Sequence, residues 1–331
     1  MTMIKKALTR WSAGLILGGL LSVSAHADTL KIGAMPVGSG WYVAAAALEK
    51  VIEASVKDTD VEIIARGGGV ANPMVVQQGK ADIALSNVAT SLWATRGQLL
   101  YEGQEATDIR SLVGGLNPVY IGAIVRNEYL KENGFSSLKE ILESDKAVNI
   151  MMKPPGSNIP PAVDIVLKAH GISRADIEAR GGRIIQIDSS QMAPLMRDGR
   201  ADLYFDTVLR GHPTIQEIAL TADVSFIDLS QESMDALAEY GLQKGEIPQW
   251  FDIQDKPTLG GDFGTHLIAH KNLPDDVAYA ITKSVVEHME TLAAEFPAWK
   301  AFKLERAASP ETNGIPLHPG AERYYKEKGL L

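Results

Sequence analysis

Residues 30–49 read Leu-Lys-Ile-Gly-Ala-Met-Pro-Val-Gly-Ser-Gly-Trp-Tyr-Val-Ala-Ala-Ala-Ala-Leu-Glu. Apolar residues alternate with others over 30–34, which predicts a short strand. A turn rich in glycine follows at 38–40, and the alanine run 44–47 predicts a helix that reaches about Ala54. The first N–H groups of a helix have no internal partner and favour negative charge. This stretch therefore predicts a strand–turn–helix unit whose turn suits an anion.

The same order of elements is predicted a second time further along the chain. The segments Gly-Lys-Ala-Asp-Ile-Ala-Leu (79–85) and Gly-Arg-Ala-Asp-Leu-Tyr-Phe (199–205) fall at matching places, each after a predicted strand, turn and helix. Chance likeness of two ordinary βαβ arrays is the alternative. We favour two similar α/β domains, with ligand-facing turns at the carboxyl ends of their strands.

Two such domains predict a two-lobed α/β protein with a ligand cleft between the lobes. The extended segment 119–125 is the predicted crossing from the first lobe to the second, and 263–269 is the predicted return. The approximate lobe bounds that we predict are 28–120 plus 265–331 for the first lobe, and 121–264 for the second.

The N-terminal stretch 1–27 has the features of a cleaved secretory signal. Three basic residues precede the apolar run 11–23, and Ala25-His26-Ala27 places small residues at the two key cleavage positions. The apolar core is short for a membrane span, which disfavours the alternative of an N-terminal anchor. We expect cleavage between Ala27 and Asp28 and export of the mature chain.

Charge and composition narrow the function further. Loss of residues 1–27 removes three basic residues and no acidic one, so the formal charge moves from −9 to −12. An acidic exported chain is a poor nucleic-acid binder, and we expect no nucleic-acid partner. The chain has no cysteine, so its core must suffice without disulfides. No later stretch approaches 18 apolar residues, which predicts no membrane span after the signal.

The sequence offers little that is typical of catalysis. It has no cysteine nucleophile and no Gly-x-Ser-x-Gly elbow. His266 and His270 fall four apart on a predicted strand, without a third ligand nearby in the sequence. We therefore expect no enzyme activity, no metal and no cofactor.

Five motifs are spread over the whole mature chain: Pro36-Val-Gly-Ser-Gly-Trp-Tyr42, Arg66-Gly-Gly-Gly-Val-Ala-Asn72, Gly79 to Leu85, Pro155-Gly-Ser157 and Leu317-His-Pro-Gly-Ala-Glu-Arg-Tyr-Tyr325. In sequence and in order they resemble the TAXI family, the extracytoplasmic solute receptors of one branch of the tripartite ATP-independent periplasmic (TRAP) transporters.

The resemblance implies a type II-like periplasmic binding-protein fold. It also implies a small organic anion as ligand, such as a dicarboxylate or glutamate, and a TRAP-type permease as membrane partner. This chain departs from the family where it has Arg66 and Gly69 in place of Thr-Gly-Gly-Ser, and Ser86-Asn87 in place of a Gln-Ser pair. The identity of the family's ligands is therefore not carried over.

The turns and strand ends of both halves supply the predicted ligand-binding residues. They are Ser39, Gly40, Trp41, Tyr42, Arg66, Gly69, Asn72, Ser86, Asn87, Gly156, Ser157, Asn158, Asp206 and Thr207.

Some of these residues have a structural alternative. Arg66 is the predicted grip on a carboxylate, and a surface ion pair is its alternative. Asn72 is expected to cap a helix and to share a ligand role. Asp206 is predicted to hold an ammonium group, or else to cap a helix. One of Trp41 and Tyr42 is expected to pack into the core.

The favoured function is a monomeric periplasmic receptor that closes its lobes on a small organic anion and delivers it to a permease driven by an ion gradient. A ligand sensor for a membrane kinase is one alternative. An exported enzyme on the same two-lobed scaffold is another, because fold alone does not settle function.

Overall fold

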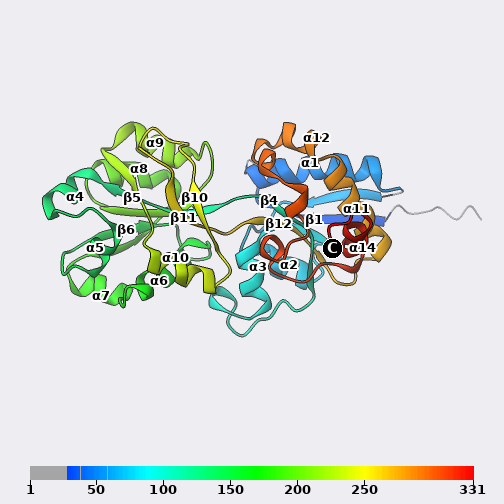
Figure 1. Cartoon of the computed structure of the whole chain (residues 1–331), viewed down its shortest axis with the longest axis horizontal. Coiled ribbons are helices and arrows are strands. Elements are labelled where there is room, and N and C mark those ends of the chain that lie inside the picture. The colour runs from blue at the N-terminus through cyan, green and yellow to red at the C-terminus, as the bar shows by residue number, and fades with distance from the viewer. Residues whose placement is uncertain (1–27, 38, 58) are drawn as a thin grey trace, which may run out of the picture.

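The computed structural model describes residues 28–331, apart from Gly38 and Asp58, and shows two α/β lobes side by side (Figure 1). The predicted signal, and the Ala27 side of the predicted cleavage site, lie outside the described residues. In the part of the chain that is described, none of the helices has the length and apolar character to cross a membrane. The two-lobed α/β fold predicted from the sequence is confirmed.

Lobe 1 is built on a five-stranded mixed sheet in the order β2-β1-β3-β12-β4. The first three strands pair in parallel, and β12 is antiparallel to both of its neighbours. The strands are β1 (Asp28–Gly33), β2 (Thr59–Ile64), β3 (Ile83–Asn87), β4 (Ile109–Asn117) and β12 (Thr265–His270).

Helices cover both faces of this sheet. A core that includes Leu48, Ile52, Val285 and Tyr325 packs α1, α11, α12 and α14 against one face, and α2 and α3 lie on the other (Figure 1). The helices of lobe 1 are α1 (Gly40–Ser55), α2 (Asn72–Gln77), α3 (Val88–Thr95), η1 (Leu99–Tyr101), α11 (Asp275–Glu287), α12 (Met289–Glu295), η3 (Pro297–Ala301), η4 (Leu304–Arg306), α13 (Pro310–Asn313) and α14 (Pro319–Glu327).

Lobe 2 is built on a seven-stranded sheet in the order β10-β11-β5-β8-β6-β7, with β9 also paired to β5. Strands β7, β6 and β8 are parallel, and β5 is antiparallel to β8. The strands are β5 (Tyr120–Arg126), β6 (Asn149–Met152), β7 (Arg183–Gln186), β8 (Leu203–Val208), β9 (Val224–Ile227), β10 (Gln243–Ile247) and β11 (Thr258–Asp262).

Two helical layers enclose the second sheet as well. Met192, Met196 and Ile215 pack α8 and α9 on one face, and α5, α6, α7 and α10 lie on the other (Figure 1). The helices are α4 (Asn127–Asn133), α5 (Leu138–Glu143), α6 (Ile159–Ala169), α7 (Arg174–Ala179), η2 (Ser189–Gln191), α8 (Met192–Arg197), α9 (Pro213–Thr221) and α10 (Gln231–Glu239).

The repeat read from the sequence is present in the structure. The arrangement β2-β1-β3 of lobe 1 matches β7-β6-β8 of lobe 2. In lobe 1 the carboxylate of Asp82 accepts the N–H of Lys31 at 2.7 Å, and in lobe 2 that of Asp202 accepts the N–H of Asn149 at 2.9 Å. Each Gly-x-Ala-Asp segment therefore ties its own strand to the central parallel strand of its lobe through the same hydrogen bond.

The crossings between the lobes are shorter than the sequence predicts. The predicted segment 119–125 is almost wholly strand β5 of lobe 2, and the predicted return 263–269 is mostly strand β12 of lobe 1. Residues Ile121 to Val125 are all buried, because helices cover both faces of the sheet around this strand. The chain changes sheets only over residues 118–119 and 263–264.

A continuous core joins the lobes at these crossings. Trp93 of α3 packs edge-on against Phe263, with ring centroids 6.0 Å apart. Its indole N–H also donates to the carbonyl of Tyr240 in lobe 2 at 2.7 Å. The lobes are therefore held together by apolar contact as well as by the chain.

Candidate functional site

The turn before α1 has the conformation that the sequence predicts. The hydroxyl of Ser39 caps the helix by accepting the N–H of Tyr42 at 3.2 Å, and Gly40 is the first helical residue. Trp41 is buried in the core of lobe 1, whereas Tyr42 is half-buried. The two aromatic side chains thus differ in burial, as expected from the sequence.

Asn72 does not cap α2, so this expectation is wrong. It is fully buried at the first helical position, and Ala71 occupies the cap without a side-chain hydrogen bond. The amide nitrogen of Asn72 donates to the carbonyl of Leu85 at 2.8 Å, and its oxygen accepts the N–H of Gly68 at 3.1 Å. The side chain instead fastens the glycine loop to the end of β3, because these backbone groups need partners when buried.

The end of β3 presents neutral polar groups. Ser86 and Asn87 are both buried, and the Ser86 hydroxyl accepts from Ser91 at 2.8 Å. A Cβ placed on Gly69 would lie 2.3 Å from Oδ1 of Asn87, so only glycine lets the loop approach this closely. Behind Ser91 lies His266, whose Nε2 is 2.8 Å from the Ser91 hydroxyl.

Arg66 follows β2 at the start of the glycine loop and is exposed. Its backbone N–H donates to the carbonyl of Ile64 at 2.8 Å. Among the described residues, no acidic side chain lies within ion-pair distance of its guanidinium. The guanidinium is therefore available to a ligand or to solvent.

The equivalent turn of lobe 2 brings the two lobes into contact. Asn158 is buried, and its amide nitrogen lies 3.4 Å from Oδ1 of Asn87 in lobe 1. Gly156 is exposed with a φ of 91°. Ser39 caps α1, but Ser157 does not cap α6. The Ser157 hydroxyl instead donates to the carbonyl of Pro154 at 3.2 Å. The carboxyl edges of both sheets therefore face each other here.

Asp206 does not cap a helix, and its carboxylate already forms an ion pair with a lysine of the protein. Its side chain is 1% exposed, and Oδ1 lies 2.8 Å from the ammonium nitrogen of Lys153. The same oxygen accepts the N–H of Thr207 at 2.6 Å, and the hydroxyl of Tyr204 donates to Oδ2. Lys153 also donates to the Thr207 hydroxyl at 2.9 Å.

His212 borders this cluster and is neutral. Its Nε2 lies 3.9 Å from Oδ2 of Asp206, and its Nδ1 is buried with no partner among the described residues. Burial lowers the pKa of His212, although the nearby Asp206 opposes the shift. The cluster therefore holds one anion and one cation, and the histidine adds no charge near neutral pH.

Lys153, Tyr204 and His212 were missed by the sequence analysis. The strand registers pair Ile32 with Ile83 in lobe 1 and Ile150 with Leu203 in lobe 2. Counting three residues on from Ile32 and from Ile150 places Lys153 at the position of Met35. Lys153 could have been identified from the sequence by extending the alignment of the two repeats just beyond β1 and β6.

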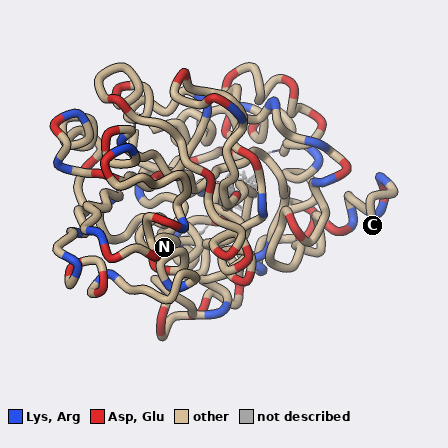
Figure 2. The backbone as a smooth tube through the Cα atoms, turned by 60° about the vertical axis from the view of Figure 1, so that its left-hand side comes forward, with Lys and Arg blue, Asp and Glu red and all other residues tan. Residues whose placement is uncertain are grey.

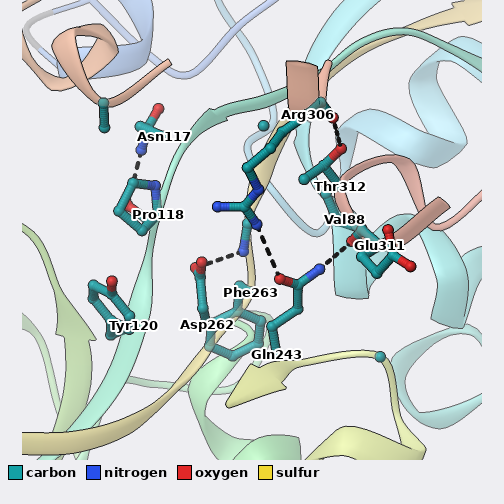
Figure 3. Close-up of a pocket in the computed structure, with 14 residues that line it drawn as sticks. Val88, Asn117, Pro118, Tyr120, Gln243, Asp262, Phe263, Arg306, Glu311 and Thr312 are labelled. Carbon is teal, nitrogen blue, oxygen red and sulfur yellow. Dashed lines mark hydrogen bonds between the residues drawn. The ribbon is translucent and has the colours of Figure 1, made fainter. Parts of the chain in front are cut away.

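A cavity of about 190 Å³ lies beside the crossings, and residues of both lobes line it (Figure 3). One carboxylate oxygen of Asp262 accepts the N–H of Val119 at 2.7 Å and that of Gly264 at 2.8 Å. Asp262 therefore ties one crossing to the other. Burial raises the pKa of Asp262 to about 6, although the two N–H donors oppose the shift.

The same cavity carries direct contacts between the lobes (Figure 3). In lobe 2, Gln243 accepts from the guanidinium of Arg306 at 3.3 Å and donates to the carbonyl of Glu311, both in lobe 1. Oδ1 of Asn117 is buried there without a partner among the described residues. Gln243 therefore links the two lobes beside the crossings.

Figure 2 shows acidic and basic positions interspersed along the backbone. Within the described residues, no group of three or more His, Asp or Glu side chains is placed to hold a metal ion. Charged side chains that lie at or just beyond the carboxyl ends of strands β2, β6, β7 and β8 include Arg66, Lys153, Asp188, Asp206 and Arg210.

The sequence and the fold both match known proteins. The profile of a family described as NMT1-like matches residues 32–329. A TctC solute-binding protein from Polaromonas has a similar structure, with 14% identity, a TM-score of 0.52, and coverage of 93% of this chain and 99% of that chain.

Two further structures were solved with small ligands. MatC from Rhodopseudomonas palustris with bound malate has 12% identity, a TM-score of 0.52, and coverage of 92% of this chain and 98% of that chain. PhnD1 from Prochlorococcus marinus in complex with methylphosphonate has 12% identity, a TM-score of 0.53, and coverage of 92% and 99%. At this identity, the likeness shows the fold.

Proposed function

Because the chain belongs to the NMT1-like family, we propose that it is a periplasmic solute receptor, not an enzyme, that closes its two lobes on a small organic anion. The contact between Asn87 and Asn158 carries this proposal, since it joins the carboxyl end of β3 in lobe 1 to the turn that follows β6 in lobe 2. Ligands of open α/β sheets bind at such ends. The similar structures with malate and methylphosphonate support an anionic ligand.

The site that we propose uses both edges. On lobe 1, Arg66 supplies a free cation, and the capped start of α1 supplies backbone N–H groups. On lobe 2, the turn at Gly156 and Ser157 faces the same space. Asn72 and Ser86 are fully buried, so we assign them the role of holding the loop and strand end in place.

The partner and the route to the periplasm are part of the proposal. The resemblance of several motifs to the TAXI family supports delivery of the ligand to a TRAP-type permease. Export would use residues 1–27, with cleavage between Ala27 and Asp28. We propose 28–120 with 265–331 as lobe 1 and 121–264 as lobe 2, since the sheets change within a few residues of these bounds.

Mass spectrometry of the small molecules released from the purified mature protein tests the proposal. We expect an organic acid, and calorimetry with that acid should give a one-to-one complex. Small-angle scattering should show a smaller radius of gyration for the protein with ligand than for the protein without it, because ligand favours the closed form. Release of uncharged or cationic molecules alone would contradict the proposal.

A further inference from the structure

The cavity beside the crossings holds two opposite charges that are not paired with each other (Figure 3). Asp262 ends β11, and Gln243 of β10 lies directly opposite it in the strand register. The side-chain oxygen of Gln243 accepts an N–H of the Arg306 guanidinium at 3.3 Å. Arg306 therefore extends toward Asp262, yet among the described residues no carboxylate lies within ion-pair distance of it.

One carboxylate oxygen of Asp262 is available inside the cavity. Oδ1 accepts the N–H of Val119 and that of Gly264, which fills its two lone-pair positions. Oδ2 has no hydrogen-bond partner among the described residues, and it keeps accessible surface. Because Asp262 lines the cavity, a cationic group placed there would reach Oδ2. Such a group would also compensate the burial of this carboxylate.

Arg306 supplies the opposite charge at the rim. A guanidinium has five N–H donors, and Gln243 accepts one of them. The other donors have no acceptor among the described residues. Gln243 is itself held in place, because its amide nitrogen donates to the carbonyl of Glu311. The guanidinium is thus oriented before any ligand arrives, which lowers the cost of ordering it on binding.

The size of the cavity favours a compact ligand. Its volume of about 190 Å³ is several times the roughly 30 Å³ that a water molecule takes up in the liquid. It is below the roughly 300–1,000 Å³ of sites for drug-sized ligands. The residues that line it are different from those that we propose for the ligand of the cleft. The cavity is therefore a separate place for a small molecule.

We infer that this cavity is a second binding site, and that it takes a compact zwitterion whose ammonium group pairs with Asp262 and whose carboxylate pairs with Arg306. Each charged end of the ligand then meets a protein group of opposite sign through charge-assisted hydrogen bonds. A molecule with only one of the two charges leaves either Asp262 or Arg306 without a partner. The inference does not depend on the proposed receptor function.

Glycine, glycinamide and glycolate are the probes, because they have the same number of non-hydrogen atoms and differ in charge. Glycinamide keeps the ammonium group without the carboxylate, and glycolate keeps the carboxylate without the ammonium group. Titration calorimetry on the mature protein at pH 7.5 should show glycine binding at least about ten-fold more tightly than either analogue. Equal binding of the three, or no binding of glycine, would overturn the inference.

The pH dependence of glycine binding reports on Asp262. Glycine keeps both charges between pH 5 and pH 7.5, whereas Asp262, with a pKa of about 6, gains a proton as the pH falls. Glycine should therefore bind about ten-fold more weakly at pH 5 than at pH 7.5. A flat profile would contradict the contact with Asp262.

The other titratable groups that line the cavity keep their charge over this pH range. They are Arg306, which stays protonated, Tyr120, whose pKa burial raises to about 12, and Glu311, whose pKa backbone hydrogen bonding holds below its usual range. The pH profile of glycine binding is therefore assigned to Asp262.

Two variants test the two ends of the ligand separately. Asp262→Asn keeps an oxygen for the N–H groups of the crossings, and it should weaken glycine binding about ten-fold or more and remove its pH dependence. Arg306→Met removes an exposed cation and should weaken glycine binding to a similar extent. Asp255→Asn and Lys303→Met, which change exposed charges outside the cavity, are the matched controls and should bind like the parent.

Thermal melting shows whether each variant is folded. If folded Asp262→Asn and Arg306→Met both bind glycine like the parent, glycine lies elsewhere, for instance in the cleft, and the inference is overturned. If the purified protein releases no organic acid but binds glycine as described, the receptor proposal fails and the second site stands.

Discussion

The carboxyl edges of the two lobes have the same backbone arrangement but carry different side chains. At equivalent positions in the strand registers, lobe 1 has Met35, Ala84 and Ser86, and lobe 2 has Lys153, Tyr204 and Asp206. The first set is neutral, and the second is a buried ion pair with a hydroxyl on it. The repeat therefore fixes the positions of these side chains, whereas their charges differ between the two lobes.

The difference has a physical cost that lobe 2 offsets locally. A buried carboxylate is expensive unless charge and hydrogen bonds compensate it, and Asp206 has both. Lobe 1 avoids this cost, because Ser86 and Asn87 are uncharged. Its cation, Arg66, lies on the exposed loop and needs no partner within the protein.

Truncation of the equivalent residues Asp206 and Ser86 should reveal the largest difference in stability between the two edges. Asp206→Ala leaves the ammonium group of Lys153 without its carboxylate and should lower the free energy of unfolding by about 3–4 kcal/mol. Ser86→Ala removes a neutral partner of Ser91 and should cost about 1–2 kcal/mol. Urea denaturation measures both values. Equal losses would mean that the ionic edge carries no special role in stability.

Arg66 should affect binding without affecting stability. Arg66→Ala is expected to weaken binding of the organic anion by about 2–4 kcal/mol, because a charged partner is left unpaired. Arg66→Lys should recover part of this, since the two-pronged geometry is lost. Arg96→Ala, another exposed arginine of lobe 1, is the control for calorimetry and thermal melting. Unchanged binding with an earlier melt would make Arg66 a structural residue.

Asp262 is a second buried carboxylate, and unlike Asp206 it has no cation within ion-pair distance among the described residues. Its folded pKa of about 6 lies above the ordinary 3.8. The stability that this group contributes is therefore fully present below about pH 3.8 and is lost as the pH rises through 6.

The comparison of parent and Asp262→Asn isolates this effect. Relative to the variant, the parent should lose about 1–3 kcal/mol of unfolding free energy between pH 4.5 and pH 7.5. The variant keeps an oxygen for Val119 and Gly264, so the crossing contacts remain. Denaturation curves at the two pH values measure the difference, and parallel pH profiles would contradict the prediction.

The smallest contrast concerns the glycines that open the two repeated segments. Gly79 and Gly199 have φ values of 64° and 66°, in the left-handed region. Alanine should cost about 1 kcal/mol at Gly79, where a Cβ meets open space. The cost should be greater at Gly199, where the Cβ would lie 2.9 Å from the guanidinium of Arg126 and disturb its ion pair with Asp202. Equal melting temperatures would contradict this asymmetry.

Much of the fold could be predicted from the sequence, because its signals are local. The Gly-x-Ala-Asp segments, the alanine run of α1 and the turn at Ser39 each specify an element through a few neighbouring residues. The crossings were predicted too long, since an alternating segment such as 119–125 is compatible with both a linker and a central strand. Burial on both faces decides between these, and that depends on distant helices.

The chemistry of the site was harder to predict, because it depends on pairs that are far apart in the sequence. Asp206 is visible as a strand-end carboxylate, but its partner Lys153 comes 53 residues earlier by their numbers. Asn72 has the composition of a helix cap, yet tertiary contacts with Gly68 and Leu85 claim its side chain. Neither outcome follows from local propensity.

The carboxylate of Asp262 has a mechanical consequence. Two independent linkers would let the lobes slide, tilt and twist separately. Because one oxygen binds the N–H of Val119 and that of Gly264, the two crossings are pinned at a single point. Such a joint resists sliding of one lobe past the other but allows them to rotate. Open and closed forms would then differ mainly in the angle between the lobes. In the receptor that we propose, a membrane permease would need to sense only that angle.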